Sequence, residues 1–202
     1  MKLLKIILLF TFIALSQFTV AQSVLLDSLT LDTLKAYTNL EEALKNPDNV
    51  IKLELRKKKL KSFPKEIMTF KNLQYLDLSK NNISEIPEEI EQLGSLQYLS
   101  LSKNKIESVP KQIGELSHLY YLNLNQNDLT SLPPQIGKLT KLRNLDLWSN
   151  NIERFPNEMK DLKSLKLLDL RVILIPDAEQ ERIQGMLPKT KIHFSPYCKC
   201  QQ

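Results

Sequence analysis

Pairs of leucines separated by a single polar residue recur along this chain every 23 residues, without insertion or deletion. The pairs are Leu53/Leu55, Leu76/Leu78, Leu99/Leu101, Leu122/Leu124, Leu145/Leu147 and Leu168/Leu170. Alternation of apolar and polar side chains over so short a run predicts a strand with one face buried. A unit of this size cannot bury its apolar face alone, so the constant period predicts a stack of repeats sharing one core.

The predicted strands are too short, and too far apart in sequence, to pair as hairpins. They are expected to line up in parallel, one from each repeat, in a single sheet. Further apolar rows begin each unit, follow each strand and precede each outer turn, as at Leu73, Ile83 and Ile86. Each repeat therefore contributes several core side chains, each worth about 1.5–3 kcal/mol on burial.

An asparagine recurs where each strand must turn away toward the outer wall. The residues are Asn81, Asn104, Asn127 and Asn150. A turn buried between neighbouring repeats leaves backbone donors and acceptors that need partners, and a side-chain amide supplies both kinds of group. These asparagines are predicted to form a structural ladder between repeats rather than to contact a ligand.

The outer wall carries a proline in each repeat, with an apolar residue three positions later. The pairs are Pro64/Ile67, Pro87/Ile90, Pro110/Ile113, Pro133/Ile136 and Pro156/Met159. Proline presets φ for a turn, and the spacing of three suits a short 3₁₀ or α turn. The convex side is therefore predicted to consist of short helical turns.

The complete unit, L-x-x-L-x-x-L-x-L-x-x-N-x-I-x-x-I-P-x-x-I-x-x-L, resembles the 23-residue leucine-rich repeats of many bacterial proteins. It is also similar to the repeats of the plant and animal Ras-group proteins. The resemblance implies an α/β fold, a curved solenoid with a parallel concave sheet that binds other macromolecules on that concave strand face. Two end repeats depart from the unit, because Lys58 and Ile173 stand where asparagine is expected.

The N-terminal side of the array is expected to carry a cap, which repeat arrays require. Thr38-Asn39-Leu40-Glu41 predicts a capping box with Thr38 as the N-cap, opening a capping helix within residues 38–52. Residues 22–37 show no clean period and receive no element. The repeats themselves are assigned to residues 53–175.

Residues 176–202 are expected to form a C-terminal cap and a Cys-x-Cys tail. Asp177 as the cap and Gln180 at the third position predict the start of a helix. Lys191–Phe194 then alternates as a strand, expected to pair with the edge at residues 168–170 and protect it from other chains. The two thiols, Cys198 and Cys200, are too few for a structural zinc site, and their redox state and role stay open.

Residues 1–21 have the layout of a cleavable secretory signal. A basic start precedes the apolar run Ile6–Leu15, and small and polar residues lead to a cleavage site near Ala21. The run is shorter than the roughly 20 residues that span a bilayer, so no transmembrane segment is expected in the mature chain. The protein is predicted to be exported, and periplasm, cell surface and medium all remain open destinations.

Charge and candidate chemistry change this picture little. The formal net charge of the 202 residues is +5, and removing Lys2 and Lys5 with the signal leaves +3. This excess does not favour nucleic acid, whose binders cluster cations on one face. With two histidines, four glycines and no catalytic motif, the sequence predicts no catalytic residue, no metal site and no cofactor.

The outward strand positions form columns down the predicted sheet. Tyr75, Tyr98 and Tyr121 fall in one column, and Trp148 lies toward its C-terminal side. Tyrosine tolerates a half-exposed strand position for structural reasons, but Tyr, Trp and Arg also dominate binding energies. The candidate partner-binding residues are Tyr75, Asp77, Lys80, Tyr98, Lys103, Tyr121, Asn125, Asp146, Trp148 and Arg171.

Three functions follow from these observations. The first is a secreted, non-catalytic recognition module that binds a protein, or a surface glycan, on the concave face. The second is a structural, adhesion or assembly element without a specific concave ligand. The third, which the charge does not favour, is binding of nucleic acid or anionic lipid through the basic run Arg56–Lys61. The identity of the partner and the oligomeric state are left open.

Overall fold

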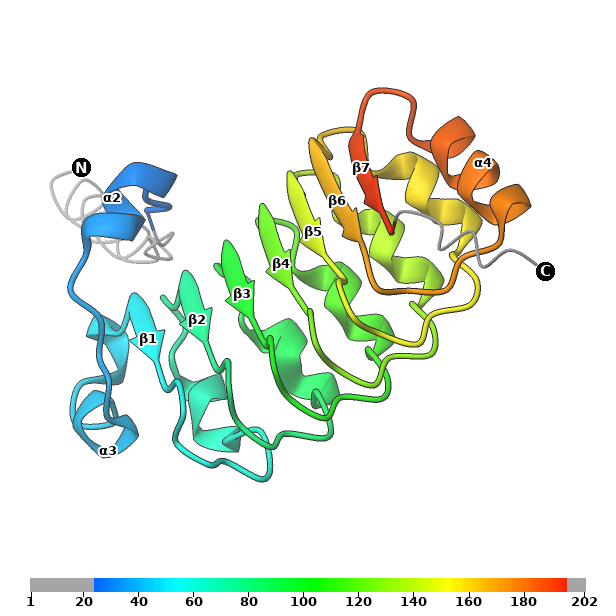
Figure 1. Cartoon of the computed structure of the whole chain (residues 1–202). Coiled ribbons are helices and arrows are strands. Elements are labelled where there is room, and N and C mark those ends of the chain that lie inside the picture. The colour runs from blue at the N-terminus through cyan, green and yellow to red at the C-terminus, as the bar shows by residue number, and fades with distance from the viewer. Residues whose placement is uncertain (1–23, 196–202) are drawn as a thin grey trace, which may run out of the picture.

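A computed structural model of the chain describes residues 24–195. The predicted signal peptide, Cys198 and Cys200 lie outside the described residues. Seven parallel strands form one open, curved sheet in sequence order, as Figure 1 shows. The strands are β1 (Lys52–Glu54), β2 (Tyr75–Asp77), β3 (Tyr98–Ser100), β4 (Tyr121–Asn123), β5 (Asn144–Asp146), β6 (Leu167–Leu170) and β7 (Lys191–Phe194). The predicted solenoid is confirmed.

Register follows the 23-residue period. Leu53 pairs with Leu76, Leu76 with Leu99, and Leu99 with Leu122. All four side chains are fully buried, as are those of the other apolar rows that begin each repeat. Because side chains alternate between the two faces of a strand, this register fixes which polar residues reach the concave surface.

Short 3₁₀ turns form the convex wall, as predicted, and stack behind the sheet (Figure 1). Each begins directly after the recurring proline, which is its N-cap. The turns are η2 (Lys65–Thr69), η3 (Glu88–Gln92), η4 (Lys111–Glu115), η5 (Pro134–Lys138) and η6 (Asn157–Asp161). Gly114 permits a close approach here, because a Cβ at this position would lie 2.5 Å from the carbonyl oxygen of Gln135 in the next turn.

The N-terminal end differs from the prediction at two points. Residues 22–37, to which the sequence analysis assigned no element, contain helix α2 (Ser28–Thr33), with Asp27 as its N-cap. The N-cap of α3 (Leu40–Ala43) is Asn39 and not Thr38. The Asn39 side chain accepts from the Glu42 backbone N–H at 3.1 Å. The capping hydrogen bond to the third helical residue is therefore made by the residue after the predicted cap, Thr38. A 3₁₀ turn, η1 (Pro47–Asn49), then leads into β1.

The C-terminal end consists of helix α4 (Asp177–Met186) followed by β7. Asp177 is the first helical residue rather than the cap; Pro176 is the N-cap, and it makes no side-chain capping bond. Gln180 instead donates to the Ile175 carbonyl at 2.9 Å. Strand β7 pairs in parallel with β6, as predicted, and covers its edge.

Candidate functional site

The three tyrosines of β2, β3 and β4 lie in register on the concave face and stack face to face. The Tyr75 and Tyr98 ring centroids are 4.0 Å apart, and those of Tyr98 and Tyr121 are 4.4 Å apart. The planes differ by 2° and 4°. Lys52 of β1 continues the column, with its ammonium 4.4 Å from the Tyr75 ring centroid. We call this row of three rings the tyrosine stack.

Packing leaves the tyrosine stack half-buried and keeps the phenols of Tyr75 and Tyr98 neutral. Burial raises the pKa of Tyr75 to about 12. Burial, with the neighbouring Tyr75 phenol, raises the pKa of Tyr98 as well. Both hydroxyls therefore remain protonated at physiological pH and can donate as well as accept hydrogen bonds.

Two positions after the tyrosine column, a second column of polar side chains turns the backbone at the ends of four strands. In four repeats a carboxylate or amide oxygen accepts from the backbone N–H two residues later, at 2.8–3.1 Å. The pairs are Asp77/Ser79, Asn123/Asn125, Asp146/Trp148 and Asp169/Arg171. Local bonds of this kind turn the backbone out of the strand.

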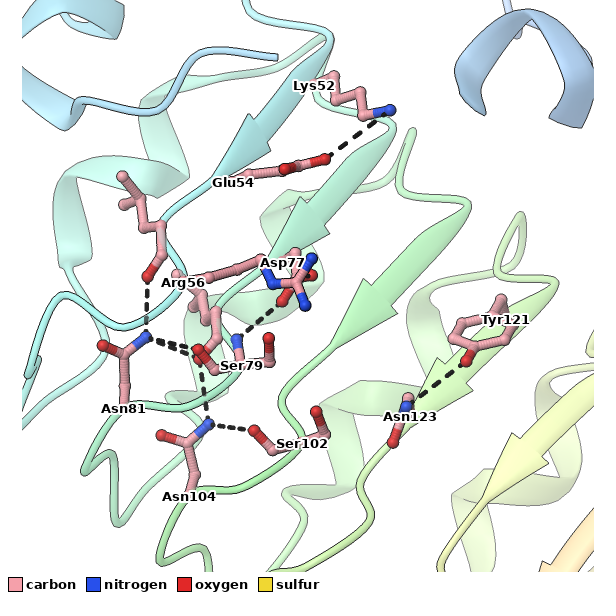
Figure 2. A network of polar contacts seen from close by, with 12 residues as sticks. Lys52, Glu54, Arg56, Asp77, Ser79, Asn81, Ser102, Asn104, Tyr121 and Asn123 are labelled. Carbon is pink, nitrogen blue, oxygen red and sulfur yellow. Dashed lines mark hydrogen bonds and ion pairs between the residues drawn. The ribbon is translucent and has the colours of Figure 1, made fainter. Parts of the chain in front are cut away.

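Asp77 differs from what the sequence predicts. The residue is 4% exposed, and its second carboxylate oxygen lies 3.4 Å from Nε of Arg56 (Figure 2). Strands on both sides, about 4.8 Å away, leave so short a side chain little exposure. Asp77 shapes the strand end and presents no free carboxylate on the surface.

The remaining candidates form polar pairs in the repeat of Trp148 and in the repeats on either side of it. Asn125 donates to Asp146 at 2.6 Å, and Arg171 forms an ion pair with Asp169 at 2.6 Å. Burial raises the pKa of Asp146. Burial opposes ionisation of Asp169 too, but hydrogen bonds from the Arg171 side chain and backbone hold its pKa below the ordinary value.

Lys80 and Lys103 do not lie among these side chains. They are exposed, three residues after the ends of β2 and β3, in the left-handed region with φ of 59° and 57°. Lys57 occupies the equivalent position one repeat earlier, and its charge, with that of Lys103, lowers the pKa of Lys80. The three lysines form a positive ridge along the strand-end edge of the concave face.

The side-chain amides of the asparagine ladder form hydrogen bonds with the backbone of the repeats themselves. Asn104 donates to the carbonyls of Leu78, one repeat earlier, and Leu101, at 3.1 and 2.9 Å. Its oxygen accepts from the Ile83 backbone N–H at 3.0 Å. Asn81, Asn127 and Asn150 are placed in the same way and are equally buried, and Figure 2 shows the first two rungs. Each amide links two repeats.

Sequence reasoning missed one group of contacts, made by residues 24–34 at the edge where the strands begin. Gln74 and Gln97, which directly precede Tyr75 and Tyr98, bond to the backbone of Val24 and Leu26. The sequence feature that could have singled out these glutamines is the tetrapeptide Leu-Gln-Tyr-Leu, which is present in two successive repeats and replaced in the next two.

Two negative findings hold for residues 24–195. No three histidine, cysteine or acidic side chains come together in a group that could hold a metal ion. None of the helices within this range has the length and apolar character needed to cross a bilayer.

Leucine-rich repeat models match most of the chain. A leucine rich repeat model matches residues 48–106, and a leucine-rich repeat region model matches residues 88–187. Together with the parallel concave sheet, these matches show that the chain belongs to the leucine-rich repeat proteins. The fold is commonly a protein-binding module, and its members are generally non-catalytic. No functionally curated protein matches the chain.

Solved structures give the same result. A leucine-rich repeat protein of Leptospira interrogans is 36% identical, with a TM-score of 0.63, over 80% of this chain and 49% of that protein. This chain thus spans about half of that relative. The ectodomain of the Arabidopsis thaliana receptor kinase GASSHO1/SCHENGEN3, solved with Casparian strip integrity factor 2, is 34% identical over 66% of this chain and 16% of its own, with a TM-score of 0.56. Internalin C2 of Listeria monocytogenes, 24% identical over 78% of this chain and 66% of its own, shares the fold with a TM-score of 0.67.

Proposed function

We propose that this protein is an exported, non-catalytic recognition module that binds a protein partner on its concave strand face. The tyrosine stack, with Trp148 on the same face, is the observation that carries the proposal. Aromatic and arginine side chains supply most of the energy at protein interfaces. Rings already held by stacking lose little conformational freedom on binding, which favours affinity.

Two further features of the face support a polar partner surface. The Asn125 side-chain oxygen is buried without a hydrogen-bond partner among residues 24–195, and so is that of Gln126. Unpaired buried acceptors are uncommon in native proteins, and a donor from a partner would satisfy them. The two amides lie on the strand-end side of the fourth repeat, close to the Trp148 backbone, which accepts from the Gln126 N–H at 2.7 Å.

The size of the face suits a macromolecule. Seven strands spaced about 4.8 Å apart give a sheet roughly 30 Å across. A standard protein interface buries about 800 Å² on each partner, which a surface of that width can supply. The receptor ectodomain described above was solved with a second protein factor, and this supports a protein rather than a glycan as the partner.

A second candidate function is adhesion or assembly through the ends of the solenoid. Leu174 is 97% exposed and Val172 is 61% exposed, and both lie between β6 and the C-terminal helix. Exposed apolar side chains that lie together favour a contact with another molecule. This role would need no ligand on the concave face.

Quantitative affinity capture with residues 22–202 separates the two functions. Extracts of the cell envelope and of neighbouring cells would be applied to the unmodified chain, to Trp148→Ala, to a Tyr75→Phe/Tyr98→Phe/Tyr121→Phe variant and to Leu174→Ser. The proposal expects Trp148→Ala to weaken capture of a specific protein about tenfold or more, with an unchanged melting temperature. The triple variant keeps the rings and tests the hydroxyls, and Leu174→Ser is the matched control. Loss of capture by Leu174→Ser alone would support the second function and contradict the first.

A further inference from the structure

The segment that precedes α2 is held by its backbone against two glutamines. Gln74 accepts from the Leu26 N–H at 2.8 Å and donates to the Val24 carbonyl at 3.0 Å. Gln97 donates to the Leu26 carbonyl at 2.8 Å. Every one of these bonds uses a main-chain atom of the segment, and none depends on which side chains the segment carries.

The side chains of the two glutamines are hydrogen-bonded to each other and buried. Gln97 also donates to the Gln74 side-chain oxygen at 2.8 Å, and the residues are 1% and 9% exposed. Their spacing by one repeat places two amides side by side along the edge where the strands begin. Alternating donors and acceptors at such an edge are what an extended peptide needs when it binds through its main chain.

The rest of the segment is attached by few apolar contacts. Lys52, 6% exposed, donates to the carbonyls of Leu31 and Asp32 at 3.1 and 3.0 Å, near the end of α2. Leu31 is fully buried but lies outside the continuous core cluster. Val24 is 80% exposed and Leu29 is 74% exposed. Leu31, the half-buried Leu26 and Leu34, and a set of polar bonds that water can replace therefore hold residues 24–34, which we call the strap.

The strap is physically linked to the tyrosine stack. The ammonium of Lys52 that holds α2 also lies 4.4 Å from the Tyr75 ring centroid. Figure 2 shows the Lys52 side chain near the start of β1, with its ammonium paired to Glu54 at 3.8 Å. Release of the strap would free this ammonium and open the first ring of the stack to a ligand.

We propose that Gln74, Gln97 and Lys52 form a backbone-reading peptide site that the strap fills as a displaceable internal occupant. In the complex, an extended peptide segment of the partner protein takes its place and continues onto the tyrosine stack. This inference rests on the proposed function, because it assumes a protein partner and specifies that the segment of the partner in contact with the sheet is extended. It also gives residues 24–34 a regulatory part, because the site opens only when they leave.

The test uses a fluorescent peptide with the sequence of residues 22–34 and the mature chain, residues 22–202. In the unmodified chain the tethered strap, at an effective concentration near the millimolar range, excludes the peptide. In Leu31→Asp the strap is released, and the peptide should bind about tenfold more tightly or better than to the unmodified chain. Adding Gln74→Ala and Gln97→Ala should abolish that binding, whereas adding Gln112→Ala on the convex wall should not. Equal binding to the unmodified chain and Leu31→Asp, or binding that survives loss of both glutamines, would overturn the proposal.

Hydrogen exchange of the unmodified chain decides the matter even if a variant does not fold. The amides of residues 26–34 should exchange roughly a hundredfold faster than those of residues 183–187, because release of the strap needs no global unfolding. Equal protection of the two segments would make the strap part of the core and refute a displaceable occupant.

One more variant separates this inference from the proposed function. Tyr98→Ala in the Leu31→Asp background should bind the peptide unchanged, because Gln74, Gln97 and Lys52 make the hydrogen bonds between the strap and the sheet. A chain that binds the peptide while Trp148→Ala leaves partner capture intact would support the strap site and contradict the concave-face function. Partner capture that depends on Trp148, in a chain that never binds the peptide, would reject the strap site alone.

Discussion

The two ends of the solenoid are closed in different ways. At the C-terminal end, β7 adds four residues of backbone pairing to the sheet, and Ile183 of α4 and its C-cap residue Leu187 belong to the continuous core. At the N-terminal end, Ala43 and Val50 close the core, and the strap lies outside them. The difference shows that one end of this solenoid is built as part of the core, whereas the other carries a layer that lies outside it.

The electrostatics of the two ends follow the same division. Arg182 of α4 binds Glu179 at 2.6 Å and the carbonyl of Phe155 in the preceding repeat at 2.5 Å. Glu179 accepts in turn from the Phe155 N–H at 3.0 Å. These contacts tie the helix to the last turn of the wall. Lys52 of β1, in contrast, donates to two carbonyls of α2, a helix of only six residues.

The largest expected effect is at the C-terminal end. Ile183→Ala removes a fully buried side chain from the core and should lower the free energy of unfolding by about 2–5 kcal/mol. Urea denaturation followed by circular dichroism measures it. A loss below about 1 kcal/mol would mean that the cap is not integral, and the contrast between the ends would fail.

The asparagine ladder between the ends should be the next most sensitive. Asn127→Ala leaves the amide of Ile106 without its acceptor and takes one of two donors from the carbonyls of Leu101 and Leu124, which Asn104 and Asn150 also reach, so a loss of about 1–3 kcal/mol is expected. Asn151→Ala, at an exposed neighbouring position, is the control and should stay within about 0.5 kcal/mol of the unmodified chain. An unchanged denaturation midpoint for Asn127→Ala would refute the ladder.

Leu31→Ala sharpens the comparison, because Leu31 is as completely buried as Ile183. If the strap is a separate layer, the loss is limited to its docking and should stay below about 1 kcal/mol in global unfolding. Limited proteolysis of the strap should nevertheless accelerate. A global loss as large as that of Ile183→Ala would place Leu31 in the cooperative core.

The smallest effect is on pH dependence. Hydrogen bonds from Arg182 hold the pKa of Glu179 below its ordinary value of 4.5. A lowered pKa stabilises the folded state above the ordinary value, and that stabilisation is lost as the pH falls through the lowered one. Melting temperatures measured between neutral pH and acid should fall less steeply for Glu179→Gln than for the unmodified chain. Parallel curves would show that the ion pair contributes nothing to the cap.

The 23-residue period carried most of the fold, because side chains alternate along each strand and each repeat must bury the same face. Strand register, the convex turns and the columns of the concave face could therefore be predicted. Caps were placed one residue off at Thr38 and Asp177, since several polar residues near a helix start can serve and local geometry chooses between them.

The strap could not be predicted from the same pattern. Its bonds join Leu26 to Gln74 and Gln97, which lie 48 and 71 residues away in the chain. These bonds use main-chain atoms of the strap, which every residue type has, so the sequence of the strap does not indicate them. The burial of Asp77 was missed for a related reason: alternation predicts the face on which a side chain lies but not how closely its neighbours cover it.

Site-specific photo-crosslinking tests the concave-face account most directly. A photoreactive phenylalanine analogue at Tyr98, on β3, would be compared with the same analogue at Lys111, on the convex turn of the same repeat. Crosslinks to one protein from position 98, and none from position 111, are the predicted result. Crosslinks from position 111 with none from position 98 would contradict recognition through the strand face.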